Sequence, residues 1–524
     1  MKKFIRSLTT CCLVAAGLIY LSGCDDDSDP QLTGDSKTYD LAPVSNPSIS
    51  GTVTFAERDD EMLVITIDLQ GTQSGENHPA HIHANTAAET GDIVLDLNAV
   101  DGATGISETV VNKLNDGTPF DYEDLISLDG YVNVHESASN LGTLVAQGDI
   151  GQNELTGDTE QYVLGSVSNP AISGMASFAK RINGETLVTV SLDGTNDGDL
   201  HPSHIHANSA AQGGGIVIDL NDIDGTTGES KTNISQRNDA TAITYDELIN
   251  FNGYLNVHLS SAALGTLIAQ GDIGQNELTG DKKDYPLGPV SNPAISGTAS
   301  FEKRKNGTAL VTVALTGTTA GNSHPSHIHA NSAAQGGGIV IDLKNIDGAT
   351  GISRTSVTQL NAGTPITYDE LLNFNGYLNV HLSAAALGTL VAQGDIGQNE
   401  LTGDNKVYTL NSVSDTAISG TATFAKRKNG KAMITISLIG TTAGGDHPSH
   451  IHANSAAQGG GIKLDLKNIS GATGKSVTSV NTLNDGTAIT YDELLTYNGY
   501  INVHLSAAAL GTLIAQGNIG SNAP

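Results

Sequence analysis

The chain repeats itself with a period of 123 residues, and this repeat constrains its fold more than any other feature. The string Leu-Thr-Gly-Asp begins at Leu32, Leu155, Leu278 and Leu401, and the four copies align without insertion or deletion. Solenoid repeats are about 20–50 residues long, so a period of this length holds a whole domain. We therefore expect four consecutive domains, at residues 32–154, 155–277, 278–400 and 401–524.

The N-terminus has the features of an export signal. Three positive charges lie within Met1–Arg6, and residues 8–22 form an apolar run that is short for a membrane span. Leu-Ser-Gly then precedes Cys24, which resembles a bacterial lipoprotein signal; an ordinary secretory signal is the alternative. The resemblance implies removal of residues 1–23, acylation of Cys24, a membrane contact through that lipid, and an acidic tether at 24–31. The expected location is the cell envelope, at the outer membrane or cell surface, although the sequence leaves the leaflet open.

Cysteine usage and charge narrow the classes of function. Cys11 and Cys12 would leave with the signal, so the mature chain would have one cysteine and no intrachain disulfide. The net charge is −31, and acidic residues fall from 21 in the first copy to 7 in the fourth, while basic residues rise from 3 to 8. Nucleic-acid binding needs clustered Lys and Arg, so we expect no nucleic-acid partner.

Within each copy the apolar residues recur mostly at every second position. Ile65, Ile67 and Leu69 alternate with Thr66 and Asp68, and the later copies preserve this alternation. Such a pattern is typical of a half-buried strand. Further strands are predicted at 51–55, 81–84, 93–97, 131–135 and 143–150. One short helix is expected in each copy, because capping boxes begin at Thr244, Thr367 and Thr490. The prediction is an all-β sandwich or barrel with one short helical crossover.

Histidine is confined to two places in every copy. The sixteen histidines are four equivalent sets, and these are the candidate metal ligands: His78, His81, His83 and His135; His201, His204, His206 and His258; His324, His327, His329 and His381; His447, His450, His452 and His504.

The spacing of these residues predicts a shared face. His81 and His83 are two positions apart, so they share one side of a strand, and His135 shares its side with Asn133 and Tyr131. His78 would reach over from a loop bent by Pro79. Three or four converging neutral imidazoles suit copper or zinc and do not suit calcium or magnesium. The alternative is that the histidines are structural and hydrogen-bond across the sheet.

The motif set resembles the chordin-type (CHRD) domain. The motifs are His-Pro-Xaa-His-Ile-His, then Tyr-Xaa-Asn-Val-His about fifty residues later, then Leu-Gly-Thr-Leu-Xaa-Ala-Gln-Gly-Asp-Ile, in all four copies. The resemblance implies an immunoglobulin-like β-barrel with limited similarity to copper/zinc superoxide dismutase, and it implies no settled function. The family's usual Gly-Glu-Ile-Arg-Gly ending is replaced here by Gly142-Thr143-Leu144-Val145-Ala146, so no role carries over for the missing Glu and Arg.

These observations favour a lipid-anchored array of four binding or structural domains, each with a His cluster for copper or zinc. The expected partner is an extracellular or periplasmic protein, or a matrix ligand. The second hypothesis is a copper-dependent redox protein. It is disfavoured because no Lys or Arg lies within ten residues of the first His-rich motif, and because no catalytic residues stand out. Asp96-Leu97-Asn98 resembles part of a calcium loop, but we interpret it as a turn, since Ser470 replaces a nearby acid in the fourth copy.

Overall fold

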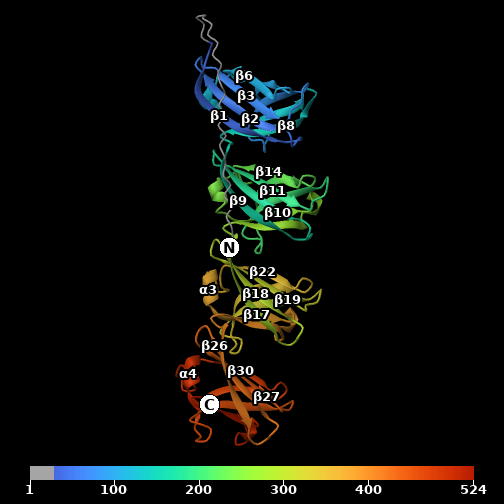
Figure 1. The fold of residues 1–524 in the computed structure, drawn as a ribbon. Helices are drawn as coiled ribbons and strands as arrows, with labels where there is room; N and C mark the ends of the chain where they lie inside the picture. Colours follow the sequence, from blue (N-terminus) through green and yellow to red (C-terminus); the bar gives the residue numbers. More distant parts are fainter. Residues whose placement is uncertain (1–28, 524) are drawn as a thin grey trace. The chain divides into compact units, whose positions relative to one another are not determined.

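The structure is a computed structural model that describes residues 29–523. It confirms the all-β prediction, with 57% strand, 6% helix and four eight-stranded barrel-like sheets in tandem (Figure 1). The signal segment and Cys24 lie outside the described residues, so the lipidation site remains a prediction. In the part of the chain that is described, no helix has the length and apolarity needed to cross a membrane.

Each copy contributes eight strands. The first has β1 (Leu32–Pro43), β2 (Ser50–Arg58), β3 (Leu63–Gln70), β4 (Asn77–Ala84), β5 (Ile93–Asp101), β6 (Ile106–Val111), β7 (Asp129–Ser137) and β8 (Asn140–Gly151). The second has β9 (Leu155–Ser166), β10 (Ser173–Arg181), β11 (Thr186–Asp193), β12 (Leu200–Ala207), β13 (Ile216–Asp224), β14 (Glu229–Ile234), β15 (Asn252–His258) and β16 (Leu267–Gly274). The third has β17 (Leu278–Pro289), β18 (Ser296–Arg304), β19 (Ala309–Thr316), β20 (Ser323–Ala330), β21 (Ile339–Asp347), β22 (Ile352–Val357), β23 (Asn375–His381) and β24 (Leu390–Gly397). The fourth has β25 (Leu401–Ser412), β26 (Ser419–Arg427), β27 (Ala432–Ile439), β28 (Asp446–Ala453), β29 (Ile462–Ser470), β30 (Lys475–Val480), β31 (Asn498–His504) and β32 (Leu513–Gly520).

The strand order is the same in every copy. In the first copy it runs β5-β4-β7-β8-β1-β2-β3-β6, with antiparallel neighbours. In the second and fourth copies the two end strands also pair, through Asp224 with Glu229 and Ser470 with Lys475, and this closes the barrel. The pairing of β4 with β7 places the two His-bearing strands side by side, and Ile82 lies opposite Val132, 50 residues further along the chain.

The alternating residues identified from the sequence form the core. In the first copy Val53, Phe55, Ile65, Ile67 and Ile82 have no exposed surface. Each barrel has its own cluster of buried apolar side chains, centred on such inward-facing residues. Burial of apolar side chains stabilises each copy by about 1.5–3 kcal/mol per large residue, so a self-contained core of this size supports a separate domain.

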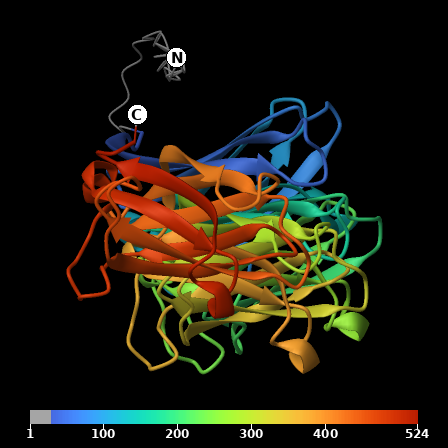
Figure 2. The ribbon, with the colours of Figure 1, turned by 90° about the horizontal axis from the view of Figure 1, so that it is seen from below.

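One short α-helix crosses over in each copy, outside the barrel (Figure 2). These helices are α1 (Tyr122–Ile126), α2 (Tyr245–Leu248), α3 (Tyr368–Asn373) and α4 (Tyr491–Thr496). The predicted capping boxes are confirmed: Thr367 Oγ1 accepts from the Glu370 amide at 3.2 Å, and a Glu370 carboxylate oxygen accepts from the Thr367 amide at 2.8 Å. The helices are four to six residues long. Asp121 caps α1 in the same way. The later copies also have one 3₁₀ turn each, η1 (Ser261–Ala263), η2 (Ala384–Ala386) and η3 (Ala507–Ala509).

The described residues divide into two compact units. The first comprises the first copy with residues 155–157 and Arg181–Asn183, and the second comprises the remainder of the three later copies. Inside the second unit, arginine side chains join consecutive copies. Arg304 donates to Asp272 at 2.6 Å and to the Asn276 carbonyl at 2.5 Å, and Arg427 makes the equivalent contacts with Asp395 and Asn399. Both arginines have no exposed surface.

Candidate metal centre

Three histidines of each copy come together on the outer face of the sheet. In the first copy they are His81 and His83 on β4 and His135 on β7, and each offers a ring nitrogen within 4.8 Å of the others. The same grouping recurs as His204, His206 and His258, as His327, His329 and His381, and as His450, His452 and His504. Twelve of the sixteen candidate ligands therefore form four triads.

The strand register explains this convergence. His81 pairs with Asn133 and His83 with Tyr131 across β4 and β7, so alternate side chains of the two strands share one face. Ile82, Val132 and Val134 point the other way and have no exposed surface. The prediction that the apolar residues face the core and the imidazoles face outward is confirmed.

In each imidazole of the triad, one ring nitrogen (the inner nitrogen) is turned toward the other two histidines, and the other (the outer nitrogen) has an oxygen atom beside it. His135 Nδ1 lies 2.7 Å from the Leu141 carbonyl, and His83 Nδ1 lies 2.9 Å from the Gly91 carbonyl. A carbonyl can only accept, so both Nδ1 atoms carry the proton and both Nε2 atoms keep a lone pair. His81 is turned the other way, with Nε2 3.7 Å from a carboxylate oxygen of Asp96. Histidine metal ligands are usually held by such outer partners, which fix the tautomer.

The inner nitrogens are spaced as ligands of one small cation. His81 Nδ1 lies 3.1 Å from His135 Nε2, and the equivalent distances in the third and fourth copies are 3.0 and 3.1 Å. Metal–imidazole bonds of about 2.0–2.1 Å in a tetrahedral site place two ligand nitrogens about 3.3 Å apart. In the second copy His204 Nδ1 and His258 Nε2 are buried and have no hydrogen-bond partner among the described residues. The donor set and its spacing fit copper or zinc.

The local electrostatics favour the neutral state of two members of the triad, His81 and His135. Burial lowers the pKa of His81, and repulsion from His135 lowers it further, although Asp96 acts in the opposite direction. Burial also lowers the pKa of His135, although its bond to the Leu141 carbonyl favours the charged form. Only a neutral imidazole can bind a metal ion, so these shifts favour ligation at neutral pH. The His81 side chain is 16% exposed, which leaves one side of the triad open to solvent.

The remaining histidine of each copy lies outside the triad. His78, His201, His324 and His447 are almost fully buried. His78 Nδ1 lies 3.1 Å from the backbone carbonyl of His135, so this side chain contacts the strand that carries a triad member. Pro79 is not in a loop as expected: it lies inside β4, where the register with β5 shifts between His78 and Ala80. Proline is tolerated at such bulges because no ladder hydrogen bond is needed there.

The contacts of three residues around the triad were not predicted from the sequence. Asp96 was interpreted as part of a turn, but it lies in β5 and pairs directly with His81. Tyr131 stacks on the His83 ring, with centroids 4.9 Å apart and planes inclined by 19°. Asn133 approaches His83 Nε2 to 3.5 Å and accepts a hydrogen bond from Gln147 at 2.8 Å. The alternation of Tyr131, Asn133 and His135 was visible in the sequence, but their partners depended on the strand register.

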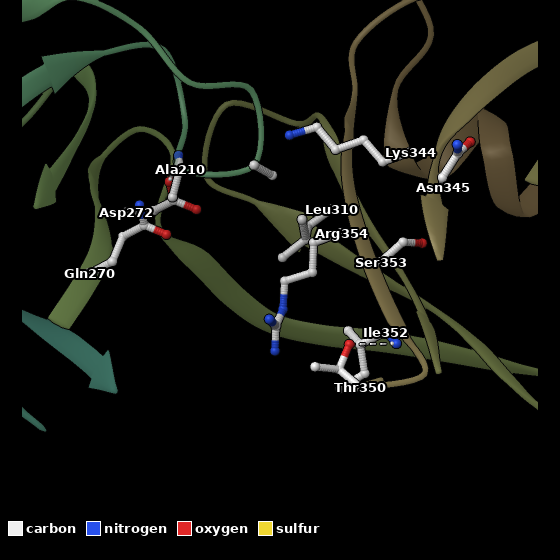
Figure 3. A pocket seen from close by; sticks show the side chains of 11 residues that line it. Ala210, Gln270, Asp272, Leu310, Lys344, Asn345, Thr350, Ile352, Ser353 and Arg354 are labelled. Atoms are coloured by element: carbon white, nitrogen blue, oxygen red, sulfur yellow. Dashed lines mark hydrogen bonds between the residues drawn. The ribbon is translucent and has the colours of Figure 1, made fainter. Parts of the chain in front are cut away.

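A cavity of about 450 Å³ lies near, and separate from, the triad of the second copy. Gln270 and Asp272 line one side of it, and Lys344 and Arg354 of the third copy line the other (Figure 3). Its lining contains no histidine. Gln270 also donates a hydrogen bond to Asn256, the equivalent of Asn133, and Asn256 lies 3.4 Å from His206 Nε2.

Comparisons with known proteins agree with the resemblance for the first copy. No curated protein matches the chain. A solved structure described as "Biofilm associated protein - BSP domain" aligns with 98% of this chain and 100% of that chain at 11% identity, with a TM-score of 0.11. Residues 31–147 match the family model of the CHRD domain, so the first copy contains a CHRD domain.

Proposed function

We propose that the chain is an exported array of four CHRD-like domains, each of which binds one copper or zinc ion through its histidine triad. The match at residues 31–147 suggests a binding or structural role for the first copy. We extend it to the other copies because they have the same repeat, strand order and triad. The N-terminal signal supports anchoring through Cys24 at the cell envelope, and an extracellular or periplasmic protein or matrix ligand is the proposed partner.

One observation carries the metal proposal. Three inner nitrogens, His81 Nδ1, His83 Nε2 and His135 Nε2, converge while their outer nitrogens face oxygen atoms. If all three outer nitrogens carry protons, then three lone pairs point at one position. Lone pairs this close repel unless a proton or a metal ion lies between them. In a purely structural role, a proton would lie between His81 Nδ1 and His135 Nε2, which are 3.1 Å apart.

Metal analysis of a soluble Cys24→Ser protein tests this proposal. We expect up to four copper or zinc ions per chain, one for each triad. Changing His81, His204, His327 and His450 together to alanine should remove most of the bound metal, because two imidazoles hold an ion much more weakly than three.

The matched control replaces His78, His201, His324 and His447 with glutamine. These histidines lie outside the triads, so the control protein should keep its metal, provided that circular dichroism shows a folded β protein. A folded wild-type chain that takes up neither copper nor zinc would contradict the proposal. Equal loss of metal from both sets of variants would also contradict it.

A copper-dependent redox activity is the second candidate. The observation that favours it is the solvent exposure of His81, which lets a small molecule approach the triad. A superoxide assay of the copper-loaded chain, with the alanine variants as the blank, distinguishes a redox protein from a protein that only holds the ion.

A further inference from the structure

We propose that the metal ion in each triad carries an additional ligand, a small anion with hydrogen-bond-accepting lone pairs, which the side-chain amide of a neighbouring asparagine selects. This inference rests on the proposed metal site. The asparagines are Asn133, Asn256, Asn379 and Asn502, each 6–7% exposed and located on the strand that carries the last histidine of its triad.

The side-chain amide of Asn133 lies beside the triad. His81, Asn133 and Gln147 are cross-strand neighbours on β4, β7 and β8, so they form one row on the outer face of the sheet. Asn133 Nδ2 lies 3.5 Å from His83 Nε2, which is one of the inner nitrogens. The equivalent distances in the other copies are 3.4, 3.5 and 3.5 Å. The amide therefore borders the place where the triad converges.

A chain of hydrogen bonds sets the orientation of this amide. The Gly91 carbonyl accepts from His83 Nδ1, so His83 Nε2 is an acceptor. Asn133 must then turn its N–H group toward His83, since its oxygen would meet a lone pair there. Gln147 Nε2 donates to Asn133 Oδ1 at 2.8 Å and holds this orientation. The same bond is 2.7, 2.7 and 2.8 Å long in the other copies.

Metal binding would take away the hydrogen-bond acceptor of this amide. His83 Nε2 is the acceptor that the structure gives Asn133 Nδ2, and the bond is already long. Once a metal ion takes that lone pair, the buried N–H group has no acceptor, which is unfavourable. A metal-bound atom with a free lone pair would restore the hydrogen bond. Hydroxide, azide, formate and hydrogencarbonate have such an atom.

The size and charge of the ligand follow from the surroundings. The asparagine is almost fully buried, and the open side of the triad is the partly exposed His81, so only a small ligand can reach the ion beside the amide. Three neutral imidazoles leave a divalent ion with its full positive charge. An anion would therefore bind more tightly than a neutral ligand of the same size.

Azide titration of the Co(II)-loaded Cys24→Ser chain tests the inference, because the visible spectrum of Co(II) reports its ligands. We expect azide to change the spectrum of the wild-type protein at all four sites. Replacing all four asparagines with leucine should leave the Co(II) content unchanged and weaken azide binding about 10- to 100-fold, the usual value of a hydrogen bond to a charged group.

Two further variants make the result decisive. Leucine at Gln147, Gln270, Gln393 and Gln516 leaves every asparagine in place but frees it to turn, so azide binding should weaken by a smaller factor. Alanine at the half-buried, outward-facing Thr66, Thr189, Thr312 and Thr435 on β3, β11, β19 and β27 is the matched control, and it should leave azide affinity unchanged. If the asparagine variant fails to fold or to bind Co(II), the azide affinity of the glutamine variant tests the inference: weaker binding supports it, and unchanged binding overturns it.

The possible failures are distinguishable. Unchanged azide affinity in Co(II)-loaded asparagine and glutamine variants would overturn this inference and leave the metal proposal intact. A folded wild-type chain that binds no Co(II), copper or zinc would overturn both. Azide binding that weakens equally in the threonine control would show that the effect is general to the outer face of the barrel, and this too would overturn the role of asparagine.

Discussion

Two imidazoles of every triad are held in the neutral state by their surroundings. Burial is the main cause of the lowered pKa of His81, His204, His327 and His450, and repulsion from the nearby histidine of the next strand adds to it. Burial also lowers the pKa of His135, His258, His381 and His504. These residues resist protonation in the folded chain more than they would in the unfolded chain.

This difference predicts that the metal-free protein loses stability in mild acid. Below the ordinary histidine pKa of 6.5, the unfolded chain binds protons at these positions before the folded chain does. The free energy of unfolding should therefore be constant above about pH 6.5 and fall as the pH drops toward the lowered pKa values. Thermal unfolding of the metal-free chain at a series of pH values measures this slope.

Replacing His81, His204, His327 and His450 with asparagine should make the same slope shallower, because half of the shifted groups are removed. Stability that rises as the pH falls through this range would contradict the assigned direction of the pKa shifts. In the metal-bound protein the loss of stability should begin at a lower pH, because protons must then compete with the ion for the imidazoles.

The shared face of His81 and His83 could be predicted from the sequence, but the approach of His135 and of the neighbouring residues depends on strand register. A spacing of two residues places His81 and His83 on one face in any strand, so local geometry was sufficient. Asp96 and Asn133 reach the triad only through the register of β4 with β5 and β7. That register depends on the bulge after His78, and no residue near it specifies the shift uniquely. His78 was grouped with the ligands because sequence distance does not show that its ring faces the backbone of β7.

The short crossover helix is the element with the clearest local signal. Thr367 and Glu370 cap α3 reciprocally, and Tyr368 and Leu371 bury their side chains against the barrel. We expect Thr367→Ala to destabilise α3 by about 1 kcal/mol, the usual value of an N-cap side chain. Hydrogen exchange of the amides in Tyr368–Asn373, followed by mass spectrometry, should become about fivefold faster.

The matched control is Thr364→Ala, a threonine in the loop before α3 that is exposed. Its removal should leave the exchange of α3 unchanged. An equal effect from both substitutions would mean that any change in this loop loosens the helix, and that the cap contributes nothing of its own.

Strand prediction succeeded where the apolar residues face the core and failed where they do not. β6 was missed because its pattern is reversed: Ser107 and Thr109 are buried, whereas Ile106 and Val110 are 46% and 40% exposed. β1 was not predicted either, since its first residues are polar and exposed and only Tyr39 and Leu41 are buried in the core. Both strands exist because their backbones pair with β2 and β3, a long-range cause that hydrophobic periodicity does not report.

At the scale of the whole chain, the charge pairs between consecutive copies are the feature that the repeat alone did not reveal. Arg304 has no exposed surface, and Asp272 is the acid that neutralises it. The other oxygen of Asp272 accepts from the Ala210 amide at 2.8 Å, so one carboxylate joins the loop of its own copy to the arginine of the next. In the fourth copy Asn518 stands at this position and retains only the loop contact, with the Ala456 amide at 2.9 Å.

This arrangement predicts an asymmetric response to substitution. Asp272→Asn keeps the acceptor for Ala210 but leaves Arg304 buried without its counter-ion, which typically costs about 3–5 kcal/mol. Removing the arginine as well, in the double variant Asp272→Asn with Arg304→Met, takes away the unpaired charge and fills its space with an apolar side chain. Calorimetry should show a lower unfolding midpoint for the single variant and recovery of most of that loss in the double variant.

The equivalent pair, Asp395 with Arg427, provides an internal repetition of the experiment, because its contacts are the same. A double variant as unstable as the single one would mean that the arginine contributes through its packing and its bond to the Asn276 carbonyl, and that the charge pair is secondary. Recovery of stability in both double variants would instead show that each aspartate neutralises a buried arginine. In the fourth copy no such arginine lies against Asn518 among the described residues, so an uncharged amide is sufficient there.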